Sequence, residues 1–274
     1  MAADASLAPV ASDASVASVS AVPRAWEHVL RHIERLLLDG EVAPGDRLPG
    51  ERALAAELGV GRSSVREALR VLEVLGLVRT HTGSGPTAGA IIIATPGGGM
   101  SALMRLQVAA SGFPVADIVA TRLVLEASVV GDLAAASGAS AHEPSPELSG
   151  ADRLLEAMDD PSLTPAEFLA LDAAFHLALA EASGNQVITA TMAGLRSGIE
   201  GYALAGLARI DDWHATSARL RAEHRGVVAD IRAADAANAR ARMHDHISGY
   251  YAEISPDRDS TPAPAPPPPP PPPR

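Results

Sequence analysis

The chain has 274 residues, 47% of them hydrophobic, which is enough for two domains with buried cores. It contains no cysteine, which excludes disulfide bonds and thiolate metal sites and is typical of a cytoplasmic protein. The net charge of −11 excludes a uniformly basic nucleic-acid-binding protein, although binding depends on where the charge lies rather than on its sum.

The acidic charge lies outside the N-terminal third. Residues 24–82 hold nine Arg and nine Asp or Glu, whereas residues 83–274 hold 13 Arg and 22 Asp or Glu. All 22 basic residues are Arg, which suits bidentate recognition, although the codon bias of a GC-rich genome explains the missing Lys equally well. The charge therefore allows a DNA-binding segment in residues 24–82.

Both ends of the chain have the composition of disordered tails, predicted over residues 1–22 and 254–274. The first tail has no basic residue, so it lacks the positive start of a secretory signal. The second contains eight consecutive prolines, which favour an extended polyproline helix; docking to a proline-recognition domain is the less favoured reading. No apolar run approaches the roughly 20 residues of a membrane span, so we expect no membrane partner.

Residues 23–95 predict a winged helix-turn-helix domain. Apolar periodicity gives the helices, and a glycine turn between β-branched runs gives the hairpin of the wing. Ser63 and Ser64 offer caps for the third helix, and Gly76 ends it. The predicted elements are helices at 25–39, 51–58 and 62–75 and a hairpin over 77–93.

The third predicted helix has two faces, as a DNA recognition helix requires. An apolar stripe would pack on the preceding helix, and it consists of Val65, Leu69 and Leu72. On the other face, donors able to reach guanine or phosphate project from the first turns; they are Arg62, Ser63 and Arg66, with Arg52 of the second helix assigned to the same surface. The alternative is that these arginines only pair with Glu51, Glu67 or Glu73 on a solvated face.

Three motifs stand in this region: Pro-Gly-Asp-Arg-Leu-Pro at 44–49, Glu-Arg at 51–52 and Val-Arg-Glu-Ala-Leu-Arg at 65–70. Together they resemble the N-terminal signature of the GntR family of bacterial transcription regulators. The resemblance implies DNA contacts by Arg52, Arg62, Ser63, Arg66 and the wing glycine near Gly85. Gly50 and Gly61 depart from the family pattern, which often has hydroxyl residues there, so a cap or phosphate contact is expected to be lost without a change of fold. For His81 and Thr82 at the tip of the wing, contact with the minor groove and a solvated loop both stay open.

A glycine-rich hinge, residues 96–100, precedes a second predicted domain, residues 101–253. Its periodicity is helical throughout, so the chain as a whole is expected to be mainly α with a C-terminal all-α bundle. The predicted helices are 101–110, 115–137, 150–159, 165–183, 186–206, 213–233 and 236–252.

One carboxylate and three imidazoles are the richest chemistry of this second domain. Asp172 and His176 are spaced i, i+4, so both project from one helix face and can ligate one ion. His224 and His246 on later helices would complete a set suited to Zn²⁺ or Ni²⁺. The pair alone is weak, because a hydrogen-bonded core histidine is the more common arrangement.

The segments around these residues, 171–185, 223–231 and 235–247, resemble the all-helical ligand domain of the FadR-type GntR subfamily, an FCD-like domain. The resemblance implies that Asp172, His176, His224 and His246 hold a divalent metal with open positions for a small carboxylate effector. It also implies that Arg122 pairs with the acidic effector; an ion pair with Glu126 is the alternative. His214 and His244 fall outside the pattern and are expected on the surface.

These features predict a cytoplasmic, ligand-responsive transcriptional regulator and not an enzyme. It would repress by binding operator DNA as a homodimer, with a divalent metal and a small organic acid in its C-terminal domain. Two alternatives stay open: a regulator that senses the metal ion itself, and a metal-dependent hydrolase. The hydrolase is less favoured because the sequence offers no convincing general base and an enzyme has no use for a winged helix.

Overall fold

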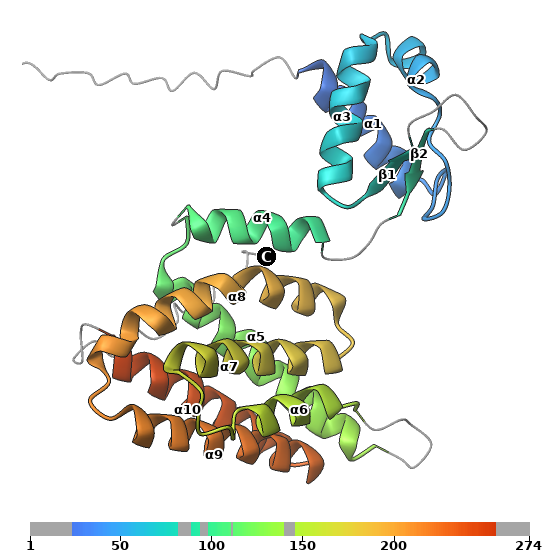
Figure 1. The fold of residues 1–274 in the computed structure, drawn as a ribbon. Coiled ribbons are helices and arrows are strands. Elements are labelled where there is room, and N and C mark those ends of the chain that lie inside the picture. Colours follow the sequence, from blue (N-terminus) through green and yellow to red (C-terminus); the bar gives the residue numbers. More distant parts are fainter. Residues whose placement is uncertain (1–23, 82–88, 94–97, 111, 140–145, 256–274) are drawn as a thin grey trace, which may run out of the picture. The chain divides into compact units, whose positions relative to one another are not determined.

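The computed structural model describes residues 24–81, 89–93, 98–110, 112–139 and 146–255 (Figure 1). Its contacts separate two compact units. The first contains the described residues up to Leu72 together with Arg79–Ile92, and the second contains Glu73–Val78 and continues from Ile93. Within the described ranges, no helix is long and apolar enough to cross a membrane. The predicted tails lie outside these ranges, apart from the two residues at the end of the last helix.

The first unit consists of three helices and a two-stranded sheet. Apolar residues of all three helices share one core, and Val65, Leu69 and Leu72 of the third helix are buried in it as predicted. The helix-turn-helix bends at Gly59, whose φ of +64° lies in the left-handed region that favours glycine. The elements are α1 (Ala25–Leu38), α2 (Glu51–Leu58), α3 (Arg62–Val74), β1 (Val78–His81) and β2 (Gly89–Ile92).

The strand β2 also binds the segment that leads into α2. Arg47 forms an antiparallel bridge with Ile91, and the Leu48 N–H donates to the Ala90 carbonyl at 2.9 Å. The entry to α2 is thereby fixed to the sheet. His81 ends β1 and is exposed, whereas Thr82 and Gly85, the other residues predicted for the wing contact, lie outside the described residues.

α3 begins at Arg62 as predicted, but its cap differs from the prediction. The carbonyl of Gly61 accepts from the N–H groups of Ser64 (3.0 Å) and Val65 (3.3 Å). Ser63 and Ser64 therefore lie inside the first turn, where they do not occupy the capping position that the sequence suggested for them. At α2 the capping residue is Gly50, which has no side chain to donate or accept, as expected.

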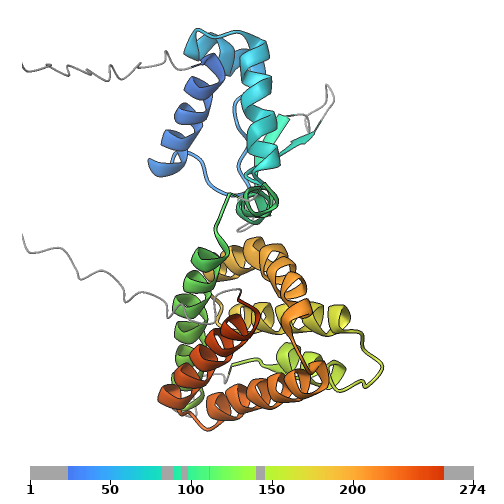
Figure 2. The same ribbon diagram turned by 90° about the vertical axis from the view of Figure 1, so that its left-hand side faces the viewer.

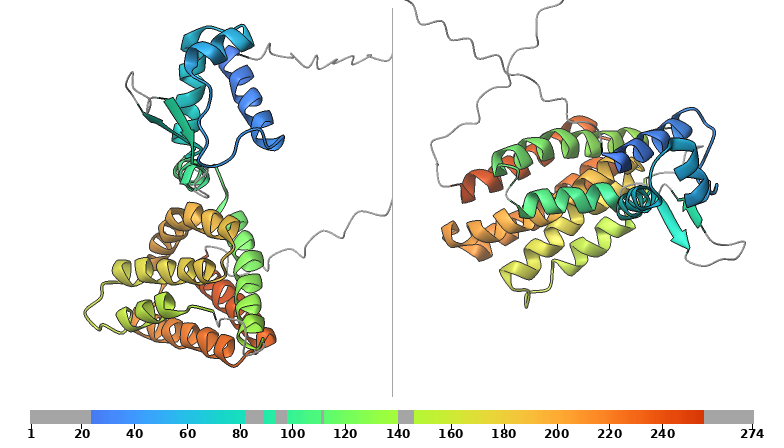
Figure 3. Two further views of the ribbon diagram at one scale, coloured as in Figure 1. Left: turned by 90° about the vertical axis from the view of Figure 1, so that its right-hand side faces the viewer. Right: turned by 90° about the horizontal axis from the view of Figure 1, so that it is seen from above.

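The second unit is a bundle of helices joined by short loops. α4 packs along α8, and α5 packs against α10, while α7 contacts α8 and α6 (Figures 1 and 3). Figure 2 shows the same bundle from another side, with α5 in green beside α10 in red. Its elements are α4 (Gly98–Ala109), α5 (Val115–Ser137), α6 (Ser149–Ala157), α7 (Pro165–Ala182), α8 (Gln186–Gly206), the 3₁₀ turn η1 (Leu207–Arg209), α9 (Trp213–Arg232) and α10 (Ala236–Ile254).

Two boundaries of the predicted bundle need correction. α4 begins at Gly98, so residues 98–100 of the predicted hinge are helical. α10 continues to Ile254, which is only 5% exposed and packs against Gly206. Burial of this apolar side chain keeps the last turn in the bundle, so the fold includes Ile254, which the sequence assigned to the tail.

Short polar motifs start the helices that carry the candidate ligands. Thr164 and Glu167 form a capping box at the start of α7, with Pro165 in its first turn. Asp212 accepts from the Ala215 N–H at α9, and Asp235 accepts from the Asn238 N–H at α10, each at 3.0 Å. Each cap therefore fixes the residue at which its helix begins.

Candidate functional site

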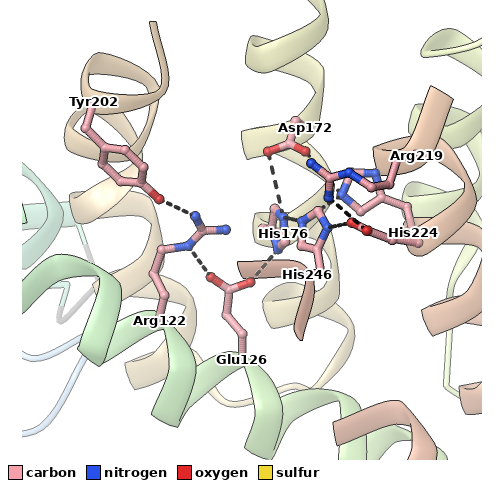
Figure 4. A network of polar contacts seen from close by, with 9 residues as sticks. Arg122, Glu126, Asp172, His176, Tyr202, Arg219, His224 and His246 are labelled. Atoms are coloured by element: carbon pink, nitrogen blue, oxygen red, sulfur yellow. Dashed lines mark hydrogen bonds and ion pairs between the residues drawn. The ribbon is translucent and has the colours of Figure 1, made fainter. Parts of the chain in front are cut away.

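Four side chains from three helices of the bundle converge in its interior (Figure 4). Asp172 and His176 lie one turn apart on α7, His224 lies on α9 and His246 on α10. Each offers one ligand atom, and these atoms all lie within 4.8 Å of one another. The Nε2 atoms of His176 and His224 are 3.2 and 3.1 Å from the Nε2 of His246. The fold thus brings together the four residues that the sequence proposed as metal ligands.

The protonation of these groups suits a cation. Burial, and then the charge of His224, lower the pKa of His246 to about 4, and burial also lowers the pKa of His224. Burial acts to raise the pKa of Asp172, but the hydrogen bond from His224 and the charges of the histidines outweigh it, so this pKa is lowered. A neutral imidazole and an ionised carboxylate are the forms that bind a divalent ion, so His224, His246 and Asp172 fit one.

Two further carboxylates contact two of the three imidazoles at Nδ1, the ring nitrogen that is not directed at the cluster. His176 Nδ1 contacts the Oε2 of Glu126 on α5, and His246 Nδ1 lies 2.8 Å from the Oε2 of Glu223 on α9. In metal sites, such carboxylates set the tautomer of the histidine and direct its free nitrogen to the ion. The sequence placed Glu126 only as a partner of Arg122, and it missed Glu223.

Arg122 lies beside this cluster on α5 and is 4% exposed. Its Nε donates to Glu126 Oε1 at 2.7 Å and its Nη1 donates to the Tyr202 hydroxyl at 2.6 Å. Burial acts to raise the pKa of Glu126, but the charges of Arg122 and then His176 outweigh it and lower this pKa to about 2. The structural ion pair left open by the sequence is therefore present. Among the described residues, however, the Nη2 of Arg122 has no hydrogen-bond partner.

A small cavity connects Arg122 with the cluster. It is bordered by Arg122, Asp172 and His246 and by the rings of Tyr202 and Tyr250. Its volume of about 10 Å³ has room for roughly one water molecule. A larger ligand therefore requires its walls to move. The other walls are apolar and consist of Leu169, Ile199, Ala203, Leu220 and Ile247.

The predicted DNA-contact residues lie on the surface of the first unit. Arg52 of α2 and Arg62, Ser63 and Arg66 of α3 are all exposed. Arg66 Nε lies 2.7 Å from Glu51 Oε2, so the predicted alternative of a surface ion pair applies to this arginine. Both side chains are more than a third exposed (54% and 37%), and such pairs contribute little free energy and exchange readily. Gly85, the fifth predicted contact, lies outside the described residues.

Sequence signals existed for some of the missed residues. Arg219 and Glu223 stand i, i+4 on α9, a spacing that predicts an ion pair. Glu223 directly precedes His224 but contacts His246, because adjacent residues on a helix point about 100° apart. Tyr202 had no signal, since it is 80 residues from Arg122 in the chain. His214 and His244 are exposed, as expected.

Two family models match the chain. The model described as "Bacterial regulatory proteins, gntR family" matches residues 25–87, and the FCD domain model matches residues 117–249. The second match contains Arg122 and all four residues of the buried cluster, and the first contains the exposed arginines of α2 and α3.

The chain is similar to transcription regulators of known name. The chain is 33% identical over 174 residues to the HTH-type transcriptional repressor NanR of Klebsiella aerogenes, with 62% of each chain covered. It is 31% identical over 169 residues to the Glc operon transcriptional activator of Escherichia coli K12, covering 62% of this chain and 65% of that one. The alignments thus span less than two thirds of these relatives, which are transcription regulators and not enzymes.

A solved structure supports the fold. Streptococcus agalactiae GntR is similar with a TM-score of 0.54 and 24% identity, covering 81% of this chain and 97% of that one. The mainly helical architecture with an N-terminal winged helix, predicted from the sequence, is confirmed by this likeness and by the two family matches.

Proposed function

The chain belongs to the GntR family of bacterial regulatory proteins and carries an FCD domain, and from this premise we propose that it is a ligand-responsive transcriptional repressor. The first unit binds operator DNA, and the second holds a divalent metal and a small organic acid. A change in the second unit on binding the acid then alters how two DNA-binding units are spaced in a homodimer. The proposed cellular location is the cytoplasm, where the operator lies.

The DNA contacts are assigned to Arg52, Arg62, Ser63, Arg66 and Gly85. For the four of these that are described, exposure and the position on α2 and the first turns of α3 support the assignment. A guanidinium that reads guanine O6 and N7 supplies sequence discrimination, and the serine hydroxyl or N–H suits a phosphate. Arg66 exchanges its contact with Glu51 for the base when it binds.

The observation that carries the effector site is the free Nη2 of Arg122 beside the four-ligand cluster. Asp172, His176, His224 and His246 would hold the ion, with Zn²⁺ and Ni²⁺ suited to the donor set. The bound ion would supply positive charge and coordination positions for an acid. Arg122 would meet the acid's carboxylate by a charge-assisted hydrogen bond from Nη2. Because the cavity is so small, entry of the acid moves Tyr202 or Tyr250, and that movement is the signal.

The test is a titration of operator binding by fluorescence anisotropy with metal-free protein, metal-loaded protein, and metal-loaded protein with a panel of small carboxylic acids. The proposal expects tight binding by the metal-loaded protein and release only when one of the acids is added. Release or tightening caused by the ion alone would identify a metal sensor instead. Operator affinity that responds to neither ion nor acid would overturn both readings.

The homodimer has its own measurement. One winged helix with a neutral charge balance binds a half-site weakly, so we expect two copies on a palindromic operator. Light scattering together with a gel-shift titration against one and two half-sites tests this. Tight binding by a monomer would contradict it.

A further inference from the structure

The three imidazoles of the buried cluster differ in what holds their second nitrogen. His176 Nδ1 contacts Glu126, a carboxylate that is buried and held by Arg122. His224 Nδ1 has no hydrogen-bond partner among the described residues. His246 Nδ1 faces Glu223, whose side chain is 25% exposed. Of the two carboxylates that contact these histidines, Glu126 is buried and Glu223 is partly exposed to solvent.

Glu223 is itself held by a chain of contacts at the surface. Arg219 Nη1 donates to Glu223 Oε1 at 2.9 Å, and Arg219 Nη2 contacts Glu253. Glu253 also accepts from the Thr216 hydroxyl at 2.6 Å. We call Glu253, Arg219 and Glu223 the ionic clasp; Figure 4 shows its Arg219 near the buried histidines. It joins the last turn of α10 to α9, and its inner end is the carboxylate that touches His246.

The clasp decides which nitrogen of His246 faces the cluster. The Glu223 carboxylate accepts a hydrogen bond from the N–H of Nδ1, so Nε2 is left with a lone pair directed at His176 and His224. Without that acceptor, the ring gains a second tautomer and its orientation is less restricted. Because Glu223 is partly exposed, water competes for its carboxylate. The contact from Arg219, which is itself held by Glu253, keeps the Glu223 side chain turned inward.

We propose that Arg219 is a positioning residue, which holds Glu223 and through it directs Nε2 of His246 into the metal site. The proposal rests on the metal site of the proposed function. An ion pair at the surface would thus contribute to the metal affinity of the buried site.

The test is a set of metal dissociation constants, measured by Zn²⁺ competition with a chromophoric chelator. The proteins are the full-length wild type, Arg219→Met, Glu223→Gln, the double variant, and Arg219→Lys. Arg232→Met is the matched control, because Arg232 lies on the same helix and pairs with Asp152 away from the cluster. We expect Glu223→Gln to weaken metal binding by about 10–100-fold, as loss of an outer-sphere partner does. Arg219→Met should weaken it less, Arg219→Lys should restore part of the loss, and Arg232→Met should match wild type.

The double variant separates positioning from independent effects. If Arg219 acts through Glu223, the double variant binds metal no more weakly than Glu223→Gln alone. Nitrogen-15 NMR of the metal-free proteins gives the second readout: His246 is the Nδ1–H tautomer in wild type and a mixture in Arg219→Met. A role limited to holding α9 against α10 would lower the melting temperature and leave both readouts unchanged.

Three results would overturn the proposal. Wild-type affinity in Arg219→Met, or additive losses in the double variant, removes the positioning role and leaves the metal site standing. Wild-type protein that takes up no divalent ion removes the metal site of the proposed function, and the positioning role falls with it.

Discussion

The two units place their functional charges in opposite environments. In the first unit the arginines of α2 and α3 are exposed, and the contact of Arg66 with Glu51 is a solvated ion pair. In the second unit Arg122, Glu126 and the four-residue cluster are buried, and each polar contact is a part of the packing. A surface site can therefore be changed without cost to folding, whereas the buried site uses the same atoms for stability and for binding.

Removal of Arg122 should have the largest effect. Arg122→Ala leaves the buried Glu126 carboxylate without its main partner, and breaking such a pair costs about 3–5 kcal/mol of unfolding free energy. Urea denaturation of the metal-free protein measures it. The control Arg232→Ala breaks an exposed pair with Asp152 and should cost at most about 1 kcal/mol. Equal losses in the two variants would erase the contrast between buried and exposed charges.

Metal removal should be nearly as large. An ion that binds only the folded state adds about 4 kcal/mol at a thousandfold excess over its Kd, so chelation should lower the melting temperature of the second unit. His224→Ala should abolish this difference between the loaded and chelated protein. Elemental analysis of protein purified without chelators or nickel resin identifies the ion. A His224→Ala variant that binds the ion as well as wild type would reduce the site to a cluster of core histidines.

Acid should destabilise the metal-free protein through the same cluster. The folded pKa of His246 is about 4 against 6.5 for a free histidine, so the unfolded chain takes up this proton first as the pH falls. The contribution of neutral His246 to the free energy of unfolding is therefore fully present above pH 6.5. It is lost as the pH falls towards 4, by an amount on the order of 3 kcal/mol. The lowered pKa of Glu126 adds a loss only below about pH 4.5. Urea midpoints between pH 7.5 and 4.5 measure this slope, and a flat profile would contradict it.

Substitutions of the exposed arginines in the first unit should have the smallest effect on stability, although they should weaken operator binding. Arg62→Ala and Arg66→Ala should each weaken operator binding by about 1–3 kcal/mol, the value of one bidentate base contact. Their unfolding free energy should stay within about 0.5 kcal/mol of wild type, because both side chains are exposed. Gel-shift titration and urea denaturation of the same samples give both numbers. Unaltered operator affinity in both variants would remove the recognition role from α3.

Local signals in the sequence predicted the helices closely. The periodicity and the caps gave α2, α5 and α8 with the bounds that the structure has, because a helix depends on residues three and four positions apart and on its first turn. The errors lay where tertiary contacts act on an end: Ile254 stays helical because it is buried against Gly206. For the candidate site, the i, i+4 spacing of Asp172 and His176 was readable in the same way, whereas His224 and His246 were assigned through family resemblance.

Only the tertiary structure decided how the polar groups are shared. Arg122 was assigned either to an effector or to Glu126, but in the fold it pairs with Glu126 and Tyr202 and still keeps one donor free. Glu126 in turn contacts His176 on α7, and Glu223 contacts His246 on α10. The Glu223–His246 pair is 23 residues apart in the chain, and the Arg122–Tyr202 pair is 80 residues apart. No local pattern encodes such pairs, because they form only where packed helices bring distant side chains to hydrogen-bond distance.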